Sequence, residues 1–314
     1  MNEHSNKPLT RREALGVGIA GATLAAVAPG CEPPTAHAQS NTPHPRATGG
    51  RMPVVYLPHG GGPWPFVDLG FGDRGEFDQL ATYLCSLHAI ASTPPRAVLA
   101  ISAHWEESVP TVMTAEHPPM LYDYYGFPPE SYRITWPAPG NPALATRVQQ
   151  LLASAGIPSG TNHDRGFDHG TFVPLKLTYP AAEIPTVQLS LKASLDPTEH
   201  LAIGRALAPL RDEGVFIVGS GMSYHNMRGF RGGEGRAASE AFDRWLGESV
   251  ALDTDARAAR LAQWANAPAA RAAHPREEHL LPLMVIAGAA GADRGHTAYN
   301  AALMGVRVSA YQFG

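Results

Sequence analysis

The sequence predicts an α/β fold: one domain in which helices flank a largely parallel central sheet. Short runs of consecutive apolar residues, typical of strands buried on both faces, alternate with segments in which apolar residues recur at helical spacing. After residue 52, no second stretch rich in Pro, Gly or Ser separates two such units. Residues 52–314 are therefore expected to fold as one domain.

Five segments are expected to be strands. Residues 54–57, 97–102 and 215–218 are continuous apolar runs, and residues 184–191 form a fourth strand. The segment 306–311, near the C-terminus, predicts an edge strand.

Helices are expected between these strands. The spacing of apolar residues predicts helices over residues 76–91, 144–152, 255–264 and 277–287. Another helix is expected to begin at Asp196, which is followed by Pro197 in the first helical position and Glu199 in the capping-box position. Gly214 ends that helix.

Composition excludes several classes of protein. The 314 residues are 44% hydrophobic and 17% charged, as in a globular protein with a substantial core. The net charge of -4 and the lack of a Lys/Arg-rich run give no reason to expect a nucleic-acid partner. Two cysteines, Cys31 and Cys85, cannot build a zinc ribbon or a disulfide framework.

The N-terminal segment has the features of an export signal. Thr10-Arg11-Arg12-Glu13-Ala14-Leu15 resembles the twin-arginine motif, and the uncharged residues 16–30 are too short and too weakly apolar for a stable membrane span. Ala36-His37-Ala38 offers a cleavage site. We therefore expect a signal peptide over residues 1–38, a flexible leader over 39–51, and export to the periplasm by the twin-arginine machinery. The competing interpretation, a lipid anchor on Cys31, requires a lipoprotein box that Ala-Pro-Gly-Cys matches poorly.

Replacing Arg11 and Arg12 together with lysine tests this interpretation. The double variant is expected to remain in the cytoplasm as precursor, because the twin-arginine machinery reads the arginine pair. Cell fractionation followed by immunoblotting measures this, with Arg46→Lys in the leader as the matched control. Normal amounts of the double variant outside the inner membrane would contradict the assignment.

Three of the 14 histidines, His59, His104 and His225, follow three different predicted strands. Loops at the carboxyl ends of strands in an open α/β sheet meet in one crevice, so these side chains can converge. Three neutral imidazoles suit Fe(II) or Zn(II) and leave coordination positions open. His169 is a fourth candidate, on a turn beside Gly170, and Asp168 could orient it. A single histidine at a strand end is more often structural, so the inference rests on the set.

Six short blocks carry a family resemblance. They are Pro58-His59-Gly60-Gly61-Gly62-Pro63, Ser102-Ala103-His104-Trp105-Glu106, Tyr122-Asp123-Tyr124-Tyr125-Gly126-Phe127-Pro128 with Tyr132 and Pro137-Ala138-Pro139-Gly140, Asp168-His169-Gly170, Gly221-Met222-Ser223-Tyr224-His225-Asn226, and His274-Pro275 with Glu278-His279-Leu280-Leu281-Pro282-Leu283. With these blocks, the chain from residue 53 to its end resembles the DOPA-dioxygenase-type class III extradiol ring-opening dioxygenases. The export signal departs from that family, whose members are usually cytoplasmic.

The resemblance implies a mononuclear non-haem metal site that opens a catechol ring with O2. His59, His104 and His225 would be the ligands of Fe(II), with Zn(II) able to occupy the same site. His169 would be the acid/base, with a fourth-ligand role as the alternative. His279 matches a family histidine near the pocket, and its structural alternative is a residue that packs at a helix start.

The aromatic block offers side chains that could contact a ring-shaped substrate. Tyr124, Tyr125, Phe127 and Trp136 could surround it, and core packing is the alternative for all four.

Other functions remain open at this level. His59-Gly60-Gly61-Gly62 also resembles the oxyanion loop of lipases, but the nucleophile elbow G-x-S-x-G is missing, because Val218 stands where Gly219-Ser220-Gly221 would need a glycine. A zinc hydrolase or a non-catalytic metal-binding protein could use the same histidines.

Overall fold

The structure, a computed structural model, describes residues 50–70, 72–230 and 233–314. The predicted signal peptide, Cys31 and most of the predicted leader lie outside the described residues. Within these ranges, no helix combines the length and the apolarity needed to cross a membrane.

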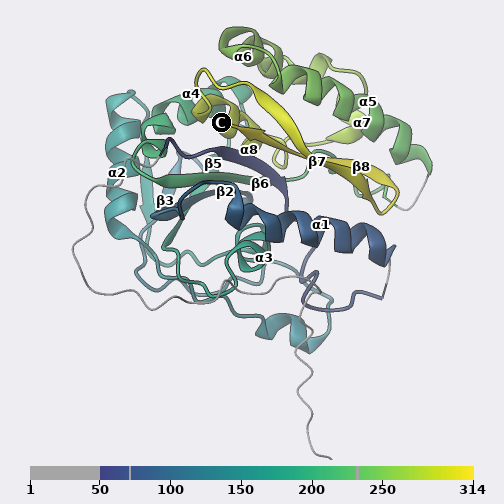
Figure 1. Ribbon diagram of the computed structural model, residues 1–314, viewed down its shortest axis with the longest axis horizontal. Helices are drawn as coiled ribbons and strands as arrows, with labels where there is room; N and C mark the ends of the chain where they lie inside the picture. Colours follow the sequence, from purple (N-terminus) through teal and green to yellow (C-terminus); the bar gives the residue numbers. More distant parts are fainter. Residues whose placement is uncertain (1–49, 71, 231–232) are drawn as a thin grey trace, which may run out of the picture.

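The fold is the single α/β domain with a mostly parallel sheet that the sequence predicts (Figure 1). The strands are Val54–Pro58 (β1), Ala97–Glu107 (β2), Thr111–Met113 (β3), Gly160–Asn162 (β4), Thr186–Lys192 (β5), Val215–Gly221 (β6), Gly295–Leu303 (β7) and Val306–Phe313 (β8). They form one sheet in the order β4-β3-β5-β2-β6-β1-β8-β7, in which β8 runs antiparallel to β1 and β7, and β3 antiparallel to β5.

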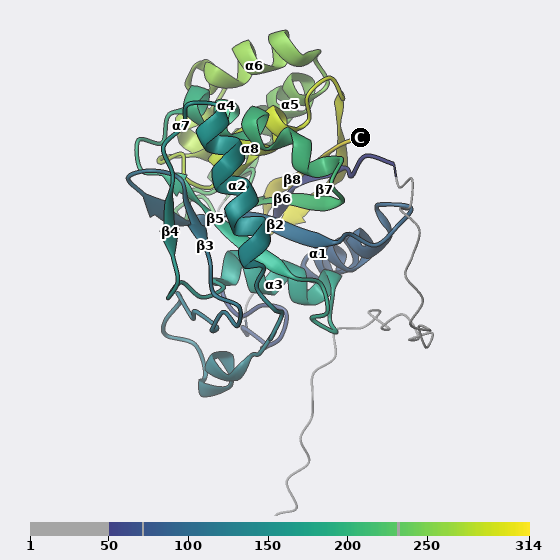
Figure 2. The same cartoon turned by 90° about the vertical axis from the view of Figure 1, so that its left-hand side faces the viewer.

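The described residues form eight α-helices, which cover both faces of this sheet. They are Arg74–Ser86 (α1), Pro142–Ser154 (α2), His169–Thr178 (α3), Pro197–Leu207 (α4), Gly233–Val250 (α5), Thr254–Ala262 (α6), Ala270–Ala273 (α7) and Leu281–Ala289 (α8). Figure 1 shows α1 and α3 on one face, with α4, α5 and α8 on the other. Figure 2 shows α2 close to β3, which lies next to the edge strand β4.

Three neighbouring parallel strands position the site. β6 lies between β1 and β2, with Pro58 opposite Gly221 and Ser102 opposite Ser220. The carboxyl ends of the three strands therefore lie side by side, where ligands bind in open α/β sheets.

Several predicted elements are confirmed and others need correction. The helix that starts after Asp196 is α4, and the Asp196 side chain accepts from the Glu199 backbone N–H as a cap. The expected edge strand at 306–311 is β8, which lies inside the sheet between β1 and β7. The helix expected from residue 277 begins only at Leu281.

The sequence pattern did not reveal α3, α5 or β7. In α3 every residue except Lys176 is buried, so the helix has no polar face and no amphipathic stripe. α5 begins in a glycine-rich stretch, and β7 lacks a clear alternation of apolar and polar residues.

Candidate metal centre

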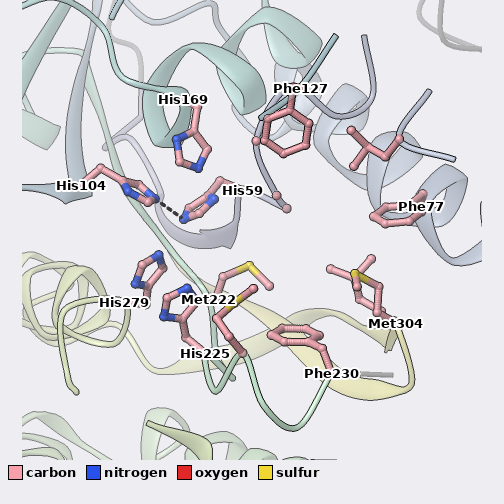
Figure 3. A pocket seen from close by; sticks show the side chains of 16 residues that line it. His59, Phe77, His104, Phe127, His169, Met222, His225, Phe230, His279 and Met304 are labelled. Carbon is pink, nitrogen blue, oxygen red and sulfur yellow. Dashed lines mark hydrogen bonds between the residues drawn. The ribbon is translucent and has the colours of Figure 1, made fainter. Parts of the chain in front are cut away.

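Five histidines line one cavity of about 490 Å³ at the carboxyl ends of β1, β2 and β6 (Figure 3). His59 directly follows β1, His104 lies within β2, and His225 lies in the segment that follows β6. His169 is the first residue of α3, not part of a turn, and His279 comes shortly before α8. The sheet topology thus brings together all five histidines that the sequence analysis considered for the site.

Glycines permit this close packing at two points. Gly60 has a φ of 78°, and a Cβ there would lie 2.5 Å from the Trp64 ring. A Cβ on Gly170 would lie 2.9 Å from the His104 ring and 2.7 Å from the Ser102 hydroxyl. Side chains at these positions would displace His104 or the turn after His59.

His59, His104 and His169 form the first of two groups that could hold a metal ion. One ligand atom from each lies within 4.8 Å of the others. The Nε2 atoms of His59 and His104 are 3.3 Å apart, the contact drawn as a dashed line in Figure 3. Two imidazole nitrogens bound to one tetrahedral ion at about 2.1 Å would be roughly 3.4 Å apart. The spacing therefore fits two ligands of a single metal.

Asp123 fixes the orientation of two of these rings. Its carboxylate accepts hydrogen bonds from Nδ1 of His169 at 2.8 Å and from the His169 backbone N–H at 2.9 Å. Nδ1 of His104 lies 3.4 Å from the same carboxylate. Burial opposes ionisation of Asp123, but the hydrogen bond from His169 and the two nearby imidazoles outweigh it and lower its pKa to about 2. Because Nδ1 of each ring is engaged in this way, Nε2 is the nitrogen that is left to coordinate a metal ion.

The second group that could hold a metal ion consists of His225, Glu278 and His279. Within it, Glu278 orients the two histidine rings as Asp123 does in the first group. Its carboxylate lies 2.9 Å from Nδ1 of His279 and 3.3 Å from Nδ1 of His225, and the two rings stack 3.3 Å apart. Burial raises the pKa of Glu278, but hydrogen bonds from His225 and His279 outweigh this and lower it well below its usual range. Nε2 of His279 is buried without a hydrogen-bond partner among the described residues, so it faces the cavity as a nitrogen that could bind a metal ion or a proton.

Burial keeps the central imidazoles neutral. Desolvation, reinforced by repulsion from neighbouring histidines, lowers the pKa of His59 far below its usual value and that of His104 to about 4. Burial likewise lowers the pKa of His279. A neutral imidazole has the free lone pair that metal binding requires, so the donor set fits a divalent non-haem metal such as Fe(II) or Zn(II).

Asp168 does not orient His169, contrary to the sequence-based suggestion. Its carboxylate is fully buried and accepts from the Ser102 hydroxyl at 2.7 Å, from Arg165 at 2.6 Å and from the Gln188 amide. It also caps α3 by accepting from the Thr171 backbone N–H. Adjacent residues at a helix start diverge, and so Asp168 supports β2 and α3 while Asp123 reaches the imidazole.

The four candidate aromatic residues are placed differently. Phe127 lines the cavity, and the Tyr124 ring lies 5.8 Å from His169 while its hydroxyl donates to the Ser131 carbonyl. Tyr125 is 91% exposed. Trp136 is fully buried and donates from its indole N–H to the Tyr179 carbonyl, so it packs in the core.

The serine at the end of β6 is a structural residue. Ser220 is 1% exposed, and its hydroxyl donates to the Gly170 carbonyl. It is therefore not placed as the nucleophile of a hydrolase.

Asp123 and Glu278 are parts of the site that were not predicted from the sequence. Asp123 lies between Tyr122 and Tyr124, and Glu278 directly precedes His279, so both belong to the sequence blocks that carry the family resemblance. That position was the available signal, because buried carboxylates commonly pair with ligating histidines.

A sequence profile described as the catalytic LigB subunit of aromatic ring-opening dioxygenase matches residues 55–312. The chain is 38% identical over 284 residues to "Dioxygenase tasH" of Hapsidospora irregularis, which covers 84% of this chain and 86% of the relative. It is 43% identical over 222 residues to "4,5-DOPA dioxygenase extradiol" of Beta vulgaris, covering 68% and 82%.

Bacterial proteins are also similar. The "4,5-DOPA dioxygenase extradiol" of Escherichia coli strain K12 is 33% identical over 243 residues, covering 76% of this chain and 85% of the relative. The crystal structure of the uncharacterized protein JW3007 from Escherichia coli K12 superposes with a TM-score of 0.69 at 30% identity, covering 84% of this chain and all of that one. The likeness therefore extends over the whole described domain.

Proposed function

Because the chain belongs to the family of the catalytic LigB subunit of aromatic ring-opening dioxygenases, we propose that it cleaves a catechol by extradiol ring opening at one Fe(II) ion. Both atoms of O2 would enter the ring-opened product. A catechol is proposed as the substrate class because relatives named 4,5-DOPA dioxygenase act on one. The observation that carries the proposal is the 3.3 Å separation of the His59 and His104 Nε2 atoms in a cavity that three further histidines line.

The side chains have separate tasks in this proposal. His59, His104 and His225 would hold the ion, with Glu278 orienting His225 and His279. When bound, Fe(II) supplies the Lewis acidity and the electron transfer that the side chains lack. The Nδ1–H of His169 donates a hydrogen bond to Asp123, so the Nε2 lone pair of His169 can accept a proton from a catechol hydroxyl.

Placement of His169 at the first position of α3 supports this role. The N-terminus of a helix carries partial positive charge from its free N–H groups, which disfavours a metal dication close by. The same position leaves the His169 imidazole facing the cavity. We therefore assign His169 to proton transfer in preference to metal binding.

Oxygen uptake tests the proposed reaction. Protein stripped with a chelator and reconstituted with Fe(II) under anaerobic conditions is expected to consume one O2 per catechol in an oxygen electrode. The Zn(II)-loaded protein is the control and is expected to consume none, because zinc has no redox chemistry. A fully Fe(II)-loaded protein that consumes no oxygen with any catechol would refute the proposal, and ester or amide hydrolysis by the Zn(II) form would favour a zinc hydrolase instead.

The place of action is a separate proposal. The N-terminal motif supports export of the folded domain to the periplasm by the twin-arginine machinery, where its catechol would be encountered.

A further inference from the structure

The cavity has two chemically different ends. Its 16 lining residues comprise five histidines, three glycines and eight apolar residues. Figure 3 shows the histidines gathered at one end and Phe77, Phe127, Phe230 and Met304 around the other. Among the described lining residues, none is Lys, Arg, Asp or Glu.

Nearby carboxylates are engaged outside this lining. Glu76, which is not among the lining residues, accepts a hydrogen bond at 2.6 Å from the Met304 backbone N–H. Asp123 and Glu278 are held by the Nδ1 atoms of the histidines that they orient. The described part of the apolar end therefore offers no charged partner to a substrate substituent.

The size of the cavity leaves room for such a substituent. Cavities of roughly 300–1,000 Å³ hold drug-sized ligands, and the 490 Å³ here exceeds what a bare catechol ring needs. Figure 3 shows Phe127, Phe230 and Met304 on the side of the cavity away from the histidine cluster. A catechol with its two hydroxyls at the histidine end would therefore direct the opposite ring carbons toward these side chains.

We propose that the substrate is a catechol with an apolar substituent on the ring, and that a charged substituent is selected against. This inference rests on the proposed function. Each buried methylene improves binding roughly fourfold. A carboxylate or ammonium placed against the same side chains loses its water and gains no charged partner among the described residues that line this end.

Binding measured by anaerobic calorimetry on the Zn(II)-loaded protein tests the preference without turnover. The probes are 4-butylcatechol and 3-(3,4-dihydroxyphenyl)propanoate, which have side chains of similar length. The alkyl catechol is expected to bind on the order of 100-fold more tightly, which is about the discrimination that a hydrophobic pocket achieves against an analogue with an added polar group. Equal binding, tighter binding of the propanoate, or no binding of either overturns the inference.

Met304→Arg is the matched gain-of-charge variant. Met304 is half-buried at the turn between β7 and β8, and the unbranched arginine stem can follow the path of methionine. The variant is expected to narrow the preference at least tenfold by pairing with the propanoate, while Met304→Leu retains the wild-type preference. Phe230→Arg provides a second position if the first variant folds poorly. An unchanged preference in both arginine variants contradicts the assignment of this end to the substituent.

Turnover separates this inference from the proposed function. Oxygen uptake by the Fe(II) protein with a higher kcat/KM for the propanoate or for 3,4-dihydroxyphenylalanine overturns the substituent preference and leaves ring cleavage intact. Absence of uptake with every probe, together with the expected binding preference, overturns ring cleavage and leaves the substrate class intact.

Discussion

His59→Ala and His104→Ala are expected to lose the metal and, with it, oxygen uptake on every catechol. The two Nε2 atoms are 3.3 Å apart and would share one ion, so removing either leaves an incomplete set of ligands. Loss of a residue that only supports a ligand lowers metal affinity by about 10–100-fold, and loss of a ligand itself should exceed about 100-fold. Activity should therefore fall to the background of the metal-free protein.

Metal content after dialysis, measured by mass spectrometry, checks this expectation. His200→Ala is the control, because His200 is also fully buried and hydrogen-bonded but lies on α4 outside the cavity lining. It should retain the metal even if its melting temperature falls. His225→Ala belongs in the same series, since His225 is the predicted third ligand. A full complement of metal in the His59 and His104 variants would contradict the assignment of these two residues as metal ligands.

His169→Ala is expected to retain the metal and to bind catechol, while turnover falls by about 10²- to 10⁴-fold, the usual contribution of a positioned proton-transfer group. The physical reason is the geometry around its ring, in which Asp123 holds Nδ1 at 2.8 Å and leaves Nε2 facing the cavity. A defect in kcat with an unchanged Kd for catechol would identify proton transfer as the lost step.

The competing outcome is informative because His169 also lies within 4.8 Å of the His59 and His104 ligand atoms. If His169→Ala loses metal as completely as His59→Ala, then His169 is a ligand and proton transfer belongs to another group, with His279 as the candidate. Metal content and catechol affinity of the two variants, measured side by side, distinguish these cases.

The strands that carry the site were predictable because each is a continuous apolar run with a glycine or histidine within two residues of its end. Runs such as residues 97–102 are buried on both faces, so their pattern reports the sheet directly. α3 escaped because burial on all sides removes the polar face that marks a helix. The antiparallel pair β7 and β8 escaped in part because pairing partners are set by the fold and not by local sequence.

The histidines of the candidate site could be predicted from the sequence, whereas the carboxylates that orient them could not. Histidines are rare enough that their places after strands indicated a shared centre. The roles of Asp123 and Glu278 became clear in three dimensions, because carboxylates are common on surfaces and these two act through contacts with histidine rings that the fold brings to them. Tyr125 and Trp136 were equally good candidates for contact with a substrate ring, yet the Tyr125 side chain is 91% exposed and Trp136 is fully buried.

The distribution of the five imidazoles along the chain has a thermodynamic consequence. His59 follows the first strand, whereas His279 precedes the last helix, so the unfolded chain scatters the donors that the native state gathers. An ion that binds only the native state shifts the folding equilibrium toward it, by about 2.7 kcal/mol when free metal exceeds Kd by 100-fold. Metal supply would thus govern how long the protein survives heat and proteases, as well as whether it turns over substrate.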